Sequence, residues 1–200
     1  MPAGPSELAV LADESCVPAF VAADLLSQAE HGPDSQVILV SDSEKVINAV
    51  LEELTLQLKQ LTRKEIADKA LKHSKAILTS SLQEGMELLN RYAPEHLIIA
   101  CKEADKLSGK VINAGSVFLG NYSCESLGDY ASGTNHTLPT NGFARSYSGV
   151  SLDSFVKKIT FQRVTEEGLE TIGPAVEVMA QAEGLWGHSK AVAIRRKSGK

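Results

Sequence analysis

The first two thirds of the chain alternate short apolar runs with segments of helical periodicity. The run Gln36–Val40 is almost entirely apolar, which is typical of a strand buried on both faces of a parallel sheet. Parallel neighbouring strands need a crossover, usually a helix, between them. The alternation therefore predicts an α/β fold, an incomplete Rossmann-like parallel sheet with flanking helices.

Residues 1–150 form the predicted sheet domain, and residues 151–200 form a small, mainly helical C-terminal appendage. The expected strands are Leu8–Ala12, Gln36–Val40, Ala76–Thr79, Leu97–Ala100 and Ser116–Leu119. The expected helices are Pro18–Glu30, Ser43–Leu61, Thr62–Ser74, Leu82–Tyr92 and Lys102–Leu107. The appendage should contain short or full helices at Leu152–Lys157, Glu166–Ala182 and Gly187–Arg196, and a β-like run at Ile159–Val164.

Between these parts, Gly120–Gly149 is rich in Gly, Ser, Thr and Asn and has almost no apolar periodicity. We expect a segment without regular structure, and loops of this composition usually shape a pocket.

Charge and composition exclude several classes of partner. The net charge of -5 provides no basic field for nucleic acid or an anionic membrane surface. No apolar run is long enough to span a membrane, and no secretory signal is recognisable. The three cysteines, Cys16, Cys101 and Cys124, lack metal-type spacing, so we expect free thiols in a cytoplasmic protein.

Four of the five histidines lie in short polar blocks, whereas His73 lies in a lysine-flanked stretch and should be an ordinary surface residue. Gln28 and His31 are three residues apart at the end of a predicted helix and therefore share a face. An imidazole and an amide oxygen on one face can both bind one ion, and zinc suits such donors. Taken alone, the pair is a weak signal and is more typical of a helix end capped by polar side chains.

Glu95 and His96 form a second candidate pair. Pro94 should force Ala93 into an extended conformation, which ends the helix and places the pair at a turn before a strand. A carboxylate beside an imidazole can supply two proton-transfer groups with different pKa ranges. The alternative interpretation is an exposed charged turn.

Several long motifs together resemble histidinol dehydrogenases, in that family's order and spacing over the whole chain. They are PAGPSE at 2–7, SQAEHGPDSQ at 27–36, PEHLI at 94–98, AGSVFLG at 114–120, GDYASGTNH at 128–136 and LPT at 138–140. The resemblance implies a zinc-dependent, NAD-linked oxidoreductase of histidine biosynthesis, which oxidises L-histidinol through the aldehyde to L-histidine.

The resemblance also implies a role for individual residues. The zinc ligands would be Gln28, His31, Asp129 and His188. Glu95 would activate water for the second oxidation, and His96 would take the alcohol proton in the first. The substrate contacts would be these four ligands, His96, Ser6, His136 and Glu183. The family further implies a homodimer whose C-terminal appendage reaches the partner's site.

Two departures from the family pattern bear on these expectations. The chain begins at the PAGPSE motif and has no G-x-G-x-x-G sequence, so we expect most of the NAD site outside it and assign it no NAD-binding residue. Trp186 and Gly187 precede His188, where the family usually has an Ala-His-Lys-Asn type of segment. The alternatives are a truncated, non-catalytic chain that binds metal and dimerises, and a metal hydrolase in which Glu95 and zinc activate water.

Overall fold

The structure is a computed structural model that describes residue 2 and residues 4–198. Its contacts divide the chain into two compact units, Met1–Phe155 and Val156–Lys200. The first unit contains the sheet and most of the candidate site residues, and the second is a pair of helices with the segment that leads into them.

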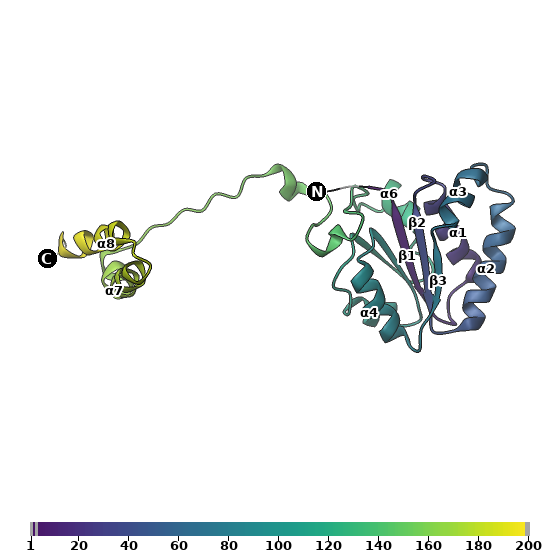
Figure 1. Cartoon of the computed structure of the whole chain (residues 1–200), viewed down its shortest axis with the longest axis horizontal. Coiled ribbons are helices and arrows are strands. Elements are labelled where there is room, and N and C mark those ends of the chain that lie inside the picture. The colour runs from purple at the N-terminus through teal and green to yellow at the C-terminus, as the bar shows by residue number, and fades with distance from the viewer. Residues whose placement is uncertain (1, 3, 199–200) are drawn as a thin grey trace. The chain divides into compact units, whose positions relative to one another are not determined.

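The first unit is built on a parallel sheet of five strands in the order β3-β2-β1-β4-β5 (Figure 1). The strands are β1 Glu7–Ala12, β2 Gln36–Ser41, β3 Lys75–Leu78, β4 His96–Ala100 and β5 Ser116–Leu119. The strands β2 and β3 follow one another on one side of β1, and β4 and β5 then follow on its other side. This is the order of a doubly wound Rossmann-like sheet with one strand fewer than the usual six. The predicted α/β class is confirmed.

Helices cover both faces of the sheet. The helices α1 Pro18–Ala29, α2 Glu44–Leu58 and α3 Lys64–Leu71 lie on one face, and α4 Leu82–Tyr92 and α5 Ala104–Ser108 pack on the other (Figure 1). In β1, Leu8 and Val10 join the core beneath α1–α3, whereas Ala9 and Leu11 join the core beneath α4. Side chains alternate across a strand, so a strand covered on both faces must be apolar throughout. Full burial of one such leucine or valine contributes about 1.5–3 kcal/mol.

This topology determines where the ends of the elements meet. Each crossover helix runs back along the sheet, so its C-terminal end reaches the edge at which the strands begin. The residues that follow α1 and α4 therefore lie near the first residues of β1 and β4, where Leu8 pairs with His96.

The expectation of an irregular segment at Gly120–Gly149 is wrong in two places. The segment contains α6 Glu125–Tyr130 and the short 3-10 helix η1 Phe143–Arg145. A Cβ atom on Gly128 would lie 2.6 Å from the ring of Phe118, so glycine allows α6 to pack directly on β5. Tertiary packing, which local composition does not reveal, stabilises this short helix.

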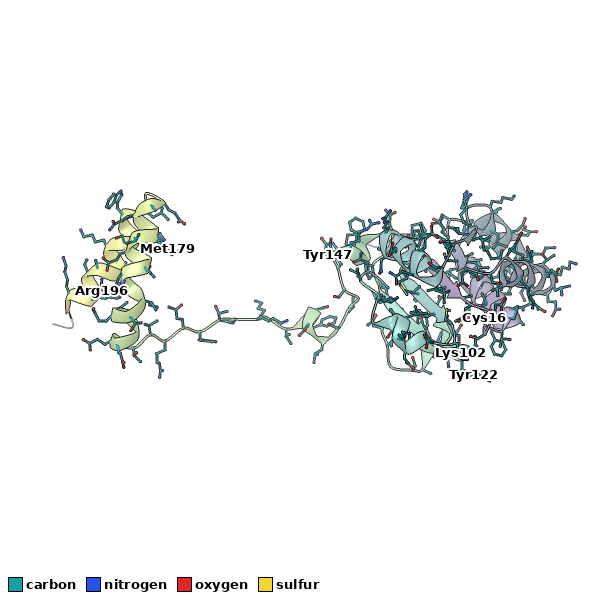
Figure 2. All side chains as sticks on the ribbon, turned by 90° about the horizontal axis from the view of Figure 1, so that it is seen from below. Cys16, Lys102, Tyr122, Tyr147, Met179 and Arg196 are labelled. Carbon is teal, nitrogen blue, oxygen red and sulfur yellow. The ribbon has the colours of Figure 1, made fainter. Side chains whose placement is uncertain are left out.

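The second unit consists of α7 Glu166–Ala182 and α8 Trp186–Ser198. Arg196, labelled in Figure 2, links the helices through ion pairs with Glu177 at 2.7 Å and Glu170 at 3.3 Å. The expected β-like run Ile159–Val164 is wrong, because these residues form no strand. β-branched residues favour a strand only where a neighbouring strand can pair with them, and this run has none. In the described part of the chain, no helix is both long and apolar enough to cross a bilayer.

Candidate active and metal site

The connection between α4 and β4 carries the first candidate pair. Ala93 adopts the left-handed conformation, with φ 58° and ψ 62°, so the expected extended conformation is wrong. Its N–H donates to Leu89 O, which closes the last turn of α4. Glu95 and His96 are only 5% and 4% exposed, so the alternative of an exposed charged turn is also wrong.

The orientation of the His96 ring follows from its hydrogen bond to the backbone. Its Nδ1 lies 3.2 Å from the carbonyl oxygen of Glu7, and a carbonyl only accepts, so Nδ1 carries the hydrogen. The lone pair is then on Nε2, which is buried without a hydrogen-bond partner among the described residues and lies 3.9 Å from Asp129 Oδ1. Burial lowers the pKa of His96, which keeps the ring neutral and Nε2 able to accept a proton.

The Glu95 carboxyl lies beside this ring and has an unusually high pKa. Its Oε2 accepts the backbone N–H of Glu7 at 2.9 Å and lies 3.7 Å from His96 Nδ1. The pKa of Glu95 is raised to about 7, mainly by burial and also by the charges of Glu7 and Asp129, while hydrogen bonds from the Glu7 N–H and Ser6 lower it. A carboxyl with this pKa can gain or lose a proton near neutral pH.

A second group of polar side chains comes from α1 and α6. Glu125 and Asp129 are four residues apart on α6 and therefore share one face of the helix. Gln28, near the end of α1, is fully buried and contacts the Glu125 carboxylate, which is 2% exposed. Glu125 Oε1 also lies 4.0 Å from His96 Nδ1, which connects this group to the acid–base pair.

Three of these side chains are arranged as a cation site would require. Ligand atoms of His31, Glu125 and Asp129 all lie within 4.8 Å of one another. The pKa of Glu125 is raised to about 9, mainly by burial and also by the nearby carboxylates of Asp129, Glu95 and Asp24. A divalent cation would relieve this concentration of negative charge, and nitrogen and oxygen donors suit zinc. The residues therefore fit a zinc ion.

The fold brings most of the predicted site residues to the edge of the sheet where β1 and β4 begin. Those that interact there are Ser6, Gln28, His31, Glu95, His96, Asp129 and, through its effect on the pKa of His96, His136. Glu183 is the C-cap residue of α7 and His188 lies in α8, so both belong to the second unit, where they are exposed.

Sequence reasoning missed Glu125, which lies among the candidate ligands. The segment around it was expected to be a loop, and the four-residue spacing to Asp129 indicates a shared face only once a helix is recognised. The spacing between Glu125 and Asp129 could therefore have identified Glu125, but only if the segment had been predicted as a helix.

The opposite edge of the sheet, at the carboxyl ends of the strands, is where dinucleotides bind in Rossmann folds. In this chain it carries acidic side chains. A shallow pocket there is lined partly by Asp13, Glu14 and Asp42, which follow β1 and β2. Carboxylates at this position repel a pyrophosphate, and the turn after β1 lacks the glycine-rich sequence that approaches one.

Fold and site together define a Rossmann-like α/β protein with a buried carboxyl–imidazole pair, Glu95 and His96, beside a cluster of candidate metal ligands. A family model described as "Histidinol dehydrogenase" matches residues 1–196. This chain therefore belongs to the histidinol dehydrogenase family.

Individual relatives agree with this assignment. The chain is 62% identical over 195 residues to a histidinol dehydrogenase of Bacteroides fragilis, covering 98% of this chain and 46% of that protein. It is 58% identical over 198 residues to the chloroplastic histidinol dehydrogenase of Arabidopsis thaliana, covering 98% and 42%. The crystal structure of histidinol dehydrogenase from Elizabethkingia anophelis is similar with a TM-score of 0.95 and 59% identity, covering 99% of this chain and 46% of that one. The chain thus spans about half the length of these relatives.

Proposed function

We propose that this chain is the zinc- and substrate-binding part of a cytoplasmic enzyme of histidine biosynthesis, which oxidises L-histidinol through the aldehyde to L-histidine with NAD. The observation that carries the proposal is the meeting of the His96–Glu95 pair with the His31, Glu125 and Asp129 cluster at one edge of the sheet. This geometry supports the proposal independently of the names of the relatives.

Zinc would be held by Gln28, His31, Asp129 and His188. When bound, zinc acts as a Lewis acid that polarises a substrate oxygen and as a template that orients the substrate. The side chains of Ser6, His136 and Glu183 would contact the substrate together with these ligands.

His96 would take the proton of the substrate alcohol in the first oxidation. Its Nδ1–H is directed to the Glu7 carbonyl, which leaves the lone pair of Nε2 directed away from the backbone. Because burial lowers the pKa of the ring, His96 starts neutral and can accept the proton without first losing one.

Glu95 would take a proton from water in the second oxidation. A pKa of about 7 makes its carboxylate a stronger base than an exposed glutamate while leaving much of it ionised at neutral pH. The N–H of Glu7 donates to one of its oxygens and fixes its position beside His96. The two groups can therefore handle different protons in the two half-reactions.

The NAD site would lie mostly in sequence that this chain does not contain. The carboxyl edge of its sheet carries Asp13, Glu14 and Asp42 in place of a phosphate-binding loop. Turnover would therefore require a further part of the enzyme, which the resemblance places N-terminal to these 200 residues.

We also propose a homodimer with shared active sites. The two-helix unit contains His188 and Glu183 and exposes large apolar side chains, among them Met179 at 65% and Trp186 at 67%, the former labelled in Figure 2. A unit of this size buries too little surface to be stable alone, so it should pack on a larger surface. The partner's sheet domain is the surface we propose.

Zinc titration of the 200-residue chain tests the metal site. We expect about one zinc ion per chain, a loss of binding in His31→Ala, and normal binding in His73→Ala, which removes an exposed imidazole outside the site. Equal zinc content in His31→Ala and the unaltered chain would refute the ligand set.

Mixing two damaged chains tests the shared site. In a dimer of His31→Ala with His188→Ala, one site would contain both altered ligands and the other neither, so refolding together should restore part of the zinc binding. A monomeric chain, or a mixture without recovery, contradicts the shared arrangement.

Substitution of the acid–base pair tests the chemistry. In an enzyme completed by the N-terminal part, Glu95→Gln and His96→Asn should each slow histidine formation by about 10²–10⁴-fold. Near-normal turnover in both variants would exclude their proposed roles.

The second candidate is a non-catalytic chain that binds metal and dimerises. The observation in its favour is the group of carboxylates Asp13, Glu14 and Asp42 that follow β1 and β2, where a dinucleotide would otherwise bind. The two candidates differ in whether NADH forms when the chain receives zinc, NAD and L-histidinol. Zinc binding without NADH, even when the N-terminal part is added, would favour the second candidate.

A further inference from the structure

Gln28 and Glu125 form a buried pair, of which only Gln28 has a stated role in the proposed chemistry. Their side chains are 0% and 2% exposed, and they come from different elements, the end of α1 and the start of α6. With the amide assigned from its hydrogen bonds, Gln28 Nε2 donates to Glu125 Oε1 at 2.9 Å and to Oε2 at 3.2 Å. One amide nitrogen therefore contacts both oxygens of one carboxylate.

This pairing decides which end of the amide faces the rest of the site. The nitrogen and oxygen of a glutamine amide have almost the same shape, so packing alone hardly distinguishes the two orientations. A cation bound nearby favours the ionised form of Glu125. An ionised carboxylate only accepts hydrogen bonds, and it therefore selects the orientation in which Nε2 faces it. The amide oxygen then points away from Glu125, and this oxygen is the one atom of the side chain suited to bind a cation.

We propose that Glu125 is a positioning residue that orients the Gln28 amide so that its oxygen can bind zinc. This inference rests on the zinc site proposed above and adds a residue that does not itself need to bind the ion. Both Glu125 oxygens accept hydrogen bonds from the amide, which is the contact that a positioning carboxylate requires. The known use of such outer carboxylates is to orient the side chains that contact the metal.

The nearness of Glu125 to His31 and Asp129 defines the competing role, in which Glu125 is itself a zinc ligand. The two roles differ in whether the effect of Glu125 depends on Gln28. A positioning residue acts through the amide, so its loss should matter little once the amide is gone. A ligand acts on the ion directly, so its loss should matter in either background.

A double-mutant cycle on the 200-residue chain separates the roles, with zinc affinity measured by competition against a chromophoric chelator. Glu125→Gln keeps the size of the side chain and should lower zinc affinity about 10–100-fold. Gln28→Ala should lower it at least as much, and the double variant should bind no more weakly than Gln28→Ala alone. Asp24→Asn, which removes another nearby carboxylate that does not contact the amide, should lower the affinity less than Glu125→Gln.

Losses that add in the double variant would overturn the proposal in favour of a direct ligand, and unchanged affinity in Glu125→Gln would overturn it outright. An equal loss in Asp24→Asn would show a general effect of charge and would also overturn it. If Glu125→Gln does not fold, Glu125→Asp replaces it in the cycle, because the shorter side chain withdraws the carboxylate from the amide. A chain whose zinc binding does not depend on His31 would instead refute the proposed zinc site itself.

Discussion

Replacing Asp24 by asparagine should make the protein's stability less dependent on pH. Asp24 is one turn before Gln28 on α1, and burial raises its pKa from 3.8 to about 7. Between these two values the folded protein retains a proton that the unfolded chain has lost. The resulting contribution to stability is complete below about pH 4 and is lost as the pH rises to about 7. An asparagine at this position does not titrate.

The magnitude follows from the linkage between proton binding and folding. One group that is protonated only in the folded state changes the free energy of unfolding by about 1.4 kcal/mol per pH unit. Between pH 5 and pH 8, Asp24→Asn should therefore gain about 3 kcal/mol of stability relative to the unaltered chain. Titrating groups that do not interact with Asp24, including His96, are common to both chains and cancel in this difference.

Urea unfolding followed by circular dichroism, with a chelator present to keep the site free of metal, measures the difference. Asp68→Asn, on the exposed side of α3, is the matched control for the loss of one carboxylate. If the stability of Asp24→Asn and that of the unaltered chain change in parallel between pH 5 and pH 8, the argument from burial of Asp24 is refuted.

Two further predictions concern packing and thiol reactivity. A Cβ atom on Gly115 would lie 2.5 Å from the carbonyl oxygen of Glu95. Gly115→Ala should therefore lower the free energy of unfolding in urea by about 1–3 kcal/mol and weaken zinc binding. A variant with unchanged stability and zinc affinity contradicts this geometry. Burial raises the pKa of Cys16 to about 11 and of Cys101 to about 12, so brief alkylation at pH 8 should modify Cys124 first. Mass spectrometry that finds equal labelling of all three thiols would count against the buried environments.

The elements of the sheet could be predicted from local patterns because each pattern has a direct physical cause. The apolar runs at β1, β2 and β4 must be buried on both faces, and their predicted bounds agree with the structure within one or two residues. The errors occur where local pattern and tertiary environment disagree. Helix α6 forms in a glycine-rich segment because it packs on Phe118, and Ile159–Val164 forms no strand because no strand pairs with it.

The sequence by itself determined the class of fold and the polar blocks from which the candidate site is built, since periodicity and residue type are properties of short segments. Only the tertiary structure decided that Glu95 and His96 are buried, that Nε2 of His96 has no hydrogen-bond partner among the described residues, and that Glu125 contacts Gln28. These properties depend on which elements meet at the edge where β1 and β4 begin. Burial, pKa and hydrogen-bond orientation arise from residues far apart in the chain, such as Gln28 and Glu125, which are 97 positions apart, and no local pattern records such contacts.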